Sequence, residues 1–154
     1  MKSKPTLLKI KMLVRDLSKN WPDKSASAIA RKYRVKLRYI GSGIDRTAFL
    51  VVGTGIVLKL SERIGQSSRE LKRISSIRRK TPSLSRYLPK VYRFGCSVSA
   101  RNSSSVVAME YCPKRATNKE VDEIGRLFKN LNDVHDNNIR KTKAGVVKII
   151  DLGY

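Results

Sequence analysis

Three side chains near the end of the sequence have the chemistry of metal ligands. Asp133 and Asn138 lie in the polar segment 131–139, and Asp151 follows the apolar run 146–150. Carboxylate and amide oxygens are the ligands that suit hard cations such as Mg²⁺. Polar turns that carry such oxygens beside apolar, strand-like runs are typical of sites that bind a metal ion together with phosphate. The segment therefore indicates a metal and phosphate site.

A glycine-rich turn earlier in the chain has the composition of a phosphate-binding loop. Gly41 and Gly43 flank Ser42. Glycines let the main chain come close to a ligand, and exposed N–H groups in such a turn can surround phosphate oxygens. An ordinary hairpin turn between two strands uses the same pattern, so the segment alone does not decide between the two interpretations.

A lysine in a strand and a glutamate in the next helix form a second candidate group. Lys59 lies in the alternating run 57–60, so it faces away from its apolar neighbours. A partly buried lysine needs a carboxylate or a phosphate as its partner. Glu70 is the only acidic residue between Glu62 and Glu110. We therefore expect a Lys59–Glu70 ion pair, although composition alone also allows two separate surface charges.

Hydrophobic periodicity predicts the elements that position these residues. Runs rich in β-branched and aromatic residues, separated by glycine turns, predict an antiparallel meander and two further strands. Apolar residues at helical spacing predict the helices. The expected strands are 35–40, 48–52, 56–60, 91–94 and 106–109, and the expected helices are 5–20, 25–33, 67–74 and 121–131, with a basic, proline-broken loop at 75–90 that has room for a short helix.

Length and composition favour a soluble intracellular protein with one or two small lobes. The chain has 154 residues, of which 40% are hydrophobic, enough for a real core. No apolar run reaches the roughly 18 residues of a membrane helix, and the N-terminus lacks the apolar segment of a signal peptide. Cys96 and Cys112 are too sparse for a disulfide framework. We expect a cytoplasmic protein without a membrane partner.

The net charge of +22 implies a strongly positive surface. Such a surface attracts polyanions, and it binds nucleic acid non-specifically whether or not that binding has a function. The charge is compatible with nucleic-acid contact, with docking on an acidic partner, or with a solvated basic face.

Residues 39–153 resemble the protein-kinase-like superfamily, which includes aminoglycoside- and choline-kinase-type phosphotransferases. Asp133 lies five residues before Asn138, and Asp151 lies thirteen residues after it, as in the catalytic segment of that superfamily. The motifs also occur in the superfamily's order: a glycine loop at 41–47, Lys59, Glu70, a hinge strand at 109–111, a catalytic loop, and Asp-Leu-Gly at 151–153 in place of Asp-Phe-Gly.

The resemblance implies an α+β, protein-kinase-like fold. Residues 35–112 would form a kinase-like N-lobe with a five-stranded antiparallel sheet and a C-helix. Residues 113–154 would form a strongly reduced C-lobe of one long helix plus a catalytic-loop hairpin with the Asp-Leu-Gly. Residues 1–34 would be an N-terminal basic helical extension.

The resemblance also implies roles in binding ATP and Mg²⁺. Asn138 and Asp151 would be the metal ligands. Lys59, oriented by Glu70, would neutralise the α- and β-phosphates. Asp133 would orient an attacking hydroxyl and accept its proton.

Other parts of the chain would hold the nucleotide itself. The main chain of Gly41, Ser42 and Gly43 would cover the phosphates, although the third glycine of the family's loop is missing. Main-chain groups of Glu110 and Cys112 would bind the adenine edge.

The catalytic loop departs from that of ordinary serine/threonine kinases. The usual His-Arg before the catalytic aspartate is replaced by Leu131-Asn132, and His135 follows two residues after Asp133. This order is similar to that of small-molecule and atypical kinases. His135 would contact the transferred phosphate, or would be a structural hydrogen-bonding residue. Asp136 is an extra metal ligand or a solvated side chain.

The chain ends at Tyr154, directly after Asp-Leu-Gly, so the helices that bind the acceptor in the family are not present in this sequence. We expect a Mg-ATP-dependent phosphotransferase that acts on a protein hydroxyl, with a protein substrate or a completing partner. Two alternatives remain: a catalytically inactive kinase-like regulator that binds nucleotide or protein, and a basic nucleic-acid-binding protein on the same scaffold.

Overall fold

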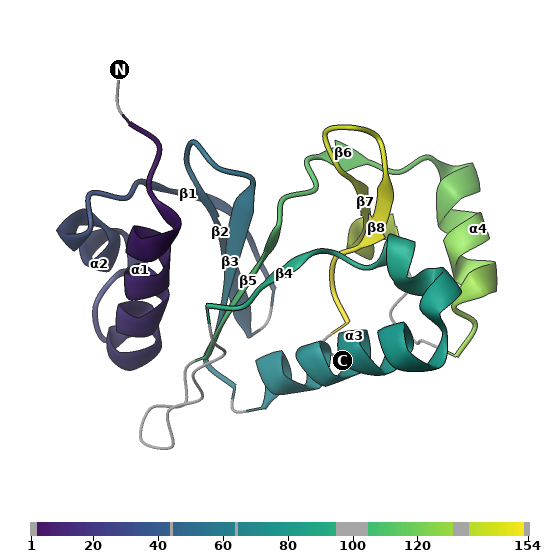
Figure 1. Cartoon of the computed structure of the whole chain (residues 1–154), viewed down its shortest axis with the longest axis horizontal. Coiled ribbons are helices and arrows are strands. Elements are labelled where there is room, and N and C mark those ends of the chain that lie inside the picture. Colours follow the sequence, from purple (N-terminus) through teal and green to yellow (C-terminus); the bar gives the residue numbers. More distant parts are fainter. Residues whose placement is uncertain (1–2, 44, 64, 95–104, 131–135, 153–154) are drawn as a thin grey trace. The chain divides into compact units, whose positions relative to one another are not determined.

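The computed structural model describes residues 3–43, 45–63, 65–94, 105–130 and 136–152. The chain divides into two units, one of Met1–Ser67 with Val91–Tyr111 and one of Ser68–Lys90 with Cys112–Tyr154. Figure 1 shows the elements of both. The last boundary between the two units follows Tyr111, at the end of the segment 109–111 that we expected to be the hinge.

Two helices begin the first unit. Helix α1 spans Leu7–Asn20 and helix α2 spans Ala26–Lys32. Each begins at a hydroxyl side chain that accepts a main-chain N–H of the first turn: Thr6 accepts from Lys9 and Ser25 accepts from Ala28. Both predicted helices are therefore confirmed, with ends shifted by two residues or fewer.

A five-stranded antiparallel sheet follows, in the spatial order β1-β2-β3-β5-β4. The predicted α+β class and the five-stranded antiparallel sheet are confirmed. The strands are β1 (Leu37–Ser42), β2 (Arg46–Val51), β3 (Ile56–Ser61), β4 (Val91–Tyr92) and β5 (Ser105–Glu110).

The core of the first unit lies between the two helices and one face of the sheet (Figure 1). From β3 it contains Ile56, Leu58 and Leu60, which alternate along the strand and are at most 4% exposed. Because neighbouring side chains of a strand point to opposite faces, Lys59 is directed to the face away from α1 and α2. This orientation agrees with the one expected from the alternating sequence.

The second unit contains most of helix α3 (Gln66–Lys80), the 3₁₀ helix η1 (Pro82–Tyr87) and helix α4 (Asn118–Leu127). The sequence placed a loop from residue 75, and this prediction was wrong for 75–80. The apolar spacing of Leu71, Ile74 and Ile77 continues the same helix face, and the first proline after this segment is Pro82. No helix in the described ranges is long and apolar enough to cross a membrane.

A small antiparallel sheet completes the second unit, in the order β6-β7-β8. Its strands are β6 (Lys114–Arg115), β7 (Ile139–Lys141) and β8 (Val147–Ile149), and the 3₁₀ helix η2 (Asp136–Asn138) leads into β7. Strand β6 was not predicted, because two exposed cations carry no strand pattern.

Candidate functional site

The hairpin formed by β7 and β8 brings Asn138 and Asp151 to the same end. Ile139 pairs with Ile149, and beyond this pair the main-chain N–H of Ile150 donates to the carbonyl of Asn138 at 2.8 Å. Asp151 is the next residue after Ile150. Asn138 is 9% exposed, and Asp151 is partly buried. The two predicted metal ligands are therefore neighbours across one hairpin.

Two long basic side chains hold this hairpin within the second unit. Arg73 of α3 donates through Nη1 to the carbonyl of Leu152 at 3.1 Å, which fixes the main chain directly after Asp151. Lys148 of β8 donates through Nζ to the carbonyl of Leu88 at 3.0 Å. Sequence reasoning missed both residues, because nothing distinguishes them among the 34 lysines and arginines.

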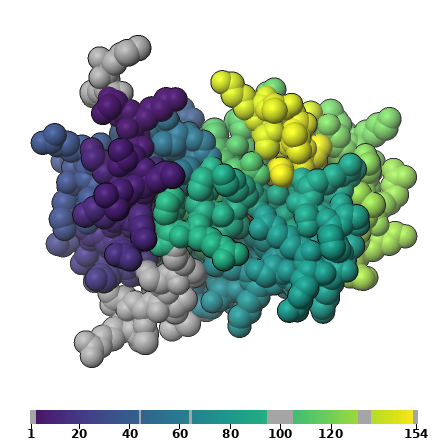
Figure 2. All heavy atoms as spheres, in the orientation of Figure 1, coloured from purple at the N-terminus to yellow at the C-terminus, as the bar shows by residue number. Residues whose placement is uncertain are grey.

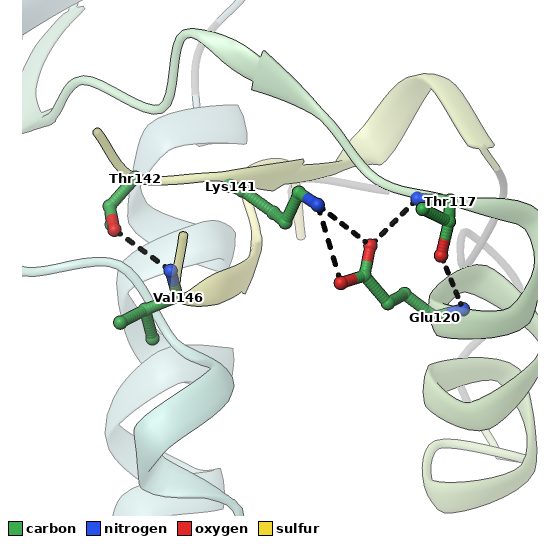
Figure 3. Close-up of polar contacts among 5 residues, drawn as sticks. All are labelled: Thr117, Glu120, Lys141, Thr142 and Val146. Carbon is green, nitrogen blue, oxygen red and sulfur yellow. Dashed lines mark hydrogen bonds and ion pairs between the residues drawn. The ribbon is translucent and has the colours of Figure 1, made fainter. Parts of the chain in front are cut away.

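An ion pair also joins the first turn of helix α4 to the last residue of strand β7. Figure 3 shows the carboxylate of Glu120 between the Thr117 amide and Lys141 Nζ, which lies 3.2 Å from Oε2. Thr117 Oγ1 accepts from the Glu120 N–H, so the two residues form a reciprocal cap at the start of α4. The hydrogen bond from the Thr117 amide, followed by the contact with Lys141, lowers the pKa of Glu120. This cap ties α4 to the strand that directly follows Asn138.

The proposed base and the catalytic-loop histidine, Asp133 and His135, lie outside the described residues. Asp136 is exposed, and its Oδ1 accepts from the Asn137 N–H at 2.9 Å. In the described ranges no group of three or more His, Cys, Asp or Glu side chains could hold a metal ion. A metal ion at Asn138 and Asp151 would thus need ligands from a bound phosphate compound and water, as Mg²⁺ commonly has.

Lys59 occupies the middle of β3, which is the central strand of the five-stranded sheet. Its direct neighbours across the strands are Ala48 and Val107. Val57, two residues away on the same face, is 6% exposed, while Lys59 itself is partly buried. The cation thus has small and apolar side chains around it on this face.

Glu70 is completely buried in α3, with a relative exposure of 0%. A carboxylate is costly to bury unless a cation or several hydrogen-bond donors compensate its charge. The burial of Glu70 therefore shows that this glutamate is not a plain surface charge. Its expected pairing with Lys59 stays a prediction.

The glycine segment forms the turn of the β1–β2 hairpin. Gly41 pairs with Ala48, and the Gly43 N–H donates to the carbonyl of Arg46 at 2.8 Å. This amide forms a hydrogen bond within the turn, as in the ordinary hairpin that the sequence also allowed. A Cβ added at Gly41 would meet no atom within 4 Å. The exposed Ser42 has its Oγ 2.8 Å from Tyr39 Oη.

The hinge segment begins at the end of β5. The Tyr111 N–H donates to the carbonyl of Gly55 at 2.8 Å. Alternate residues of a strand direct their main-chain groups to opposite sides, so those of Glu110 point away from β3. Cys112 is 6% exposed, and its carbonyl accepts from Arg140 Nε at 3.4 Å.

No protein-family model matches this chain, and no curated protein matches it either.

Proposed function

We propose that the chain is a Mg-ATP-dependent phosphotransferase with a protein-kinase-like fold. The observation that carries the proposal is the hairpin hydrogen bond between Ile150 and Asn138, which makes Asn138 and Asp151 neighbours. An amide and a carboxylate are suitable ligands for Mg²⁺, and two protein ligands suffice when phosphate oxygens and water complete the shell. The lysine on the central strand and the fully buried glutamate of α3 support it further.

Mg-ATP would supply the transferable phosphoryl group and a metal charge that stabilises its phosphates. In this proposal Asn138 and Asp151 hold the metal, and Lys59 neutralises phosphate charge while Glu70 orients it. Asp133 accepts the proton of the attacking hydroxyl, and His135 contacts the phosphoryl group.

The nucleotide base is bound by main-chain groups of Glu110 and Cys112. The Cys112 carbonyl also accepts a hydrogen bond from Arg140 Nε, which fixes the main chain of this segment. The open space beside Gly41 leaves room for a phosphate. The acceptor we propose is a protein hydroxyl, and the place of action is the cytoplasm, where ATP and magnesium are available.

Transfer of label from ATP tests this proposal. The wild-type chain should label an acceptor protein, or its own serines, in the presence of Mg²⁺ and γ-labelled ATP, and Asp133→Asn should abolish the labelling. Equal labelling by wild type and Asp133→Asn, or none by either on any acceptor, rejects the phosphotransferase.

A second function is favoured by the Gly43 N–H, which is already used by the hairpin. A glycine loop with fewer available donors would hold phosphates less tightly, as in a regulator that binds nucleotide without turnover. Stabilisation of the chain against heat by Mg-ATP, together with no transfer of label, would identify that regulator.

A further inference from the structure

The outward side of helix α1 carries apolar side chains where a surface helix normally has polar ones. Leu8 and Met12 are 66% and 46% exposed. Leu8 and Met12 are one turn apart, and Arg15 and Lys19 continue the same line along the helix. Figure 2 shows α1, in dark purple, at the surface of the molecule.

This side is distinct from the face that packs on the sheet. The buried residues of α1 are those of the opposite face: Ile10, Leu13, Val14, Leu17 and Ser18. The helix is thus already held by its own core, and exposure of Leu8 and Met12 to water contributes nothing to that packing. We call Leu8, Lys11, Met12, Arg15 and Lys19 the α1 outer face.

All charged groups of the α1 outer face are positive. Lys11, Arg15 and Lys19 are exposed, and so is Lys9 beside them. The only acidic residue of the helix is Asp16, whose side chain is 12% exposed. Its carboxylate accepts hydrogen bonds from Tyr33, Asn20 and Lys32, so it is directed at the neighbouring helix α2 and its end.

We propose that the α1 outer face binds an anionic lipid surface, with α1 lying in the plane of the interface. Exposed leucine and methionine beside lysine and arginine are typical of helices that insert apolar side chains between lipid headgroups while their cations contact the lipid phosphates. Nucleic acid fits this face less well, because Leu8 and Met12 would meet charged phosphates. We expected no membrane partner because the sequence has neither a spanning helix nor a signal peptide, whereas a helix that lies on the surface requires neither.

Co-sedimentation of the full chain with lipid vesicles tests this proposal. The chain should bind vesicles that contain about one third phosphatidylserine, should not bind pure phosphatidylcholine vesicles, and should lose binding as salt rises. The double variant Leu8→Gln/Met12→Gln should bind at least about tenfold more weakly, since it loses the inserted side chains. Glutamine keeps a high helix propensity, so circular dichroism and thermal unfolding should remain those of wild type.

Matched substitutions distinguish vesicle binding through the α1 outer face from binding through the overall positive charge of the chain. Lys11→Gln/Arg15→Gln should weaken vesicle binding by about fivefold for each cation. Leu127→Gln/Lys129→Gln removes one exposed apolar and one basic side chain from the end of α4 and should leave binding unchanged.

Three results overturn the proposal. One is equal vesicle binding by wild type and Leu8→Gln/Met12→Gln. A second is binding to duplex DNA or RNA without binding to vesicles, which assigns the face to nucleic acid. A third is binding to polyglutamate alone, which assigns it to an acidic protein. None of these measurements uses ATP, so their outcome is independent of the proposed phosphotransferase.

Discussion

The main-chain amide of Ile150 donates a hydrogen bond of 2.8 Å to the carbonyl of Asn138. Because of this bond, Asn138 and Asp151, thirteen residues apart in sequence, lie at the same end of one hairpin. An amide and a carboxylate are side chains from which a two-ligand magnesium site can be built.

Replacement of Asp151 should remove the response of the chain to magnesium and nucleotide together. Asp151→Asn preserves the shape of the side chain and removes its charge, so the increase in melting temperature caused by Mg-ATP should be lost. Differential scanning fluorimetry with Mg-ATP, and with ATP plus a chelator, measures the effect. Asp122→Asn is the control, because that carboxylate is exposed on α4 and is not one of the proposed ligands. A full Mg-ATP response in Asp151→Asn would remove Asp151 from the site.

A double-mutant cycle should reveal whether Lys59 and the buried Glu70 interact. Lys59→Met and Glu70→Gln should each lower the free energy of unfolding by about 1–3 kcal/mol, and the double variant should lose less than the sum by at least about 1 kcal/mol. Urea unfolding of the four proteins gives the coupling. The parallel cycle of Lys59→Met with Asp122→Asn, an exposed residue of α4, should be additive to within about 0.5 kcal/mol. Additivity in both cycles contradicts the ion pair.

The sequence predicted side-chain orientation best where the alternation of apolar residues and the position of a charged residue indicate the same strand face. The alternation around Lys59 predicted which face of β3 the lysine occupies, and Leu58 and Leu60 on the other face are completely buried. The placement of Asn138 and Asp151 on one hairpin was expected only from the resemblance to the kinase-like superfamily. The alternation around Lys59 is a local pattern, so a few residues suffice to define it.

Contacts made by long basic side chains could not be predicted. Arg73 donates to the carbonyl of Leu152 across 79 residues of sequence. The chain has 34 lysines and arginines, and tertiary packing decides which of them donates to a given carbonyl. A short sequence pattern does not contain that information. The end of α3 was placed too early for a related reason. Serines and arginines near residue 75 resemble a loop, while the buried Ile74 and the partly buried Ile77 still continue the apolar face of the helix.

The two hairpin glycines Gly41 and Gly55 allow a matched test of phosphate approach. A Cβ at either position would meet no atom within 4 Å, and neither glycine has a positive φ. Gly41→Ala and Gly55→Ala should therefore both fold with wild-type stability. Only Gly41→Ala should weaken Mg-ATP binding, by about tenfold, if phosphate oxygens come close to the main chain there. Isothermal titration measures the affinities, and equal affinities of the two variants would place the nucleotide elsewhere.

The start of α4 should depend on its reciprocal cap. Thr117→Ala removes the oxygen that accepts from the Glu120 N–H and should lower the free energy of unfolding by about 1 kcal/mol. Thr117→Ser retains that oxygen and should lose much less. Urea unfolding compares the two. Equal losses would mean that the methyl group of Thr117, and not its hydroxyl, matters for α4.

The link between α1 and α2 should make the stability of the first unit depend on pH. Burial raises the pKa of Asp16, but the hydrogen bonds from Tyr33, Asn20 and Lys32 outweigh it, so the pKa of this carboxyl lies below its ordinary value of 3.8. A carboxyl whose pKa is lowered by folding stabilises the folded state at pH values above the ordinary pKa. That stabilisation is lost as the pH falls through the lower pKa of the folded state.

Replacement of Asp16 isolates this contribution. The difference in free energy of unfolding between wild type and Asp16→Asn should be constant from neutral pH down to about 4 and should shrink below that. Tyr33→Phe removes the donor at 2.6 Å and keeps the ring, so the pKa of Asp16 should rise toward its ordinary value. The stabilisation by Asp16 should then be smaller, and its loss should be complete at a higher pH than in wild type. Urea unfolding at closely spaced pH values measures both. The free energies of unfolding of wild type and Asp16→Asn could instead differ by the same amount down to the most acidic pH at which the chain folds. That result would show that the charge of Asp16 does not stabilise the contact between the two helices.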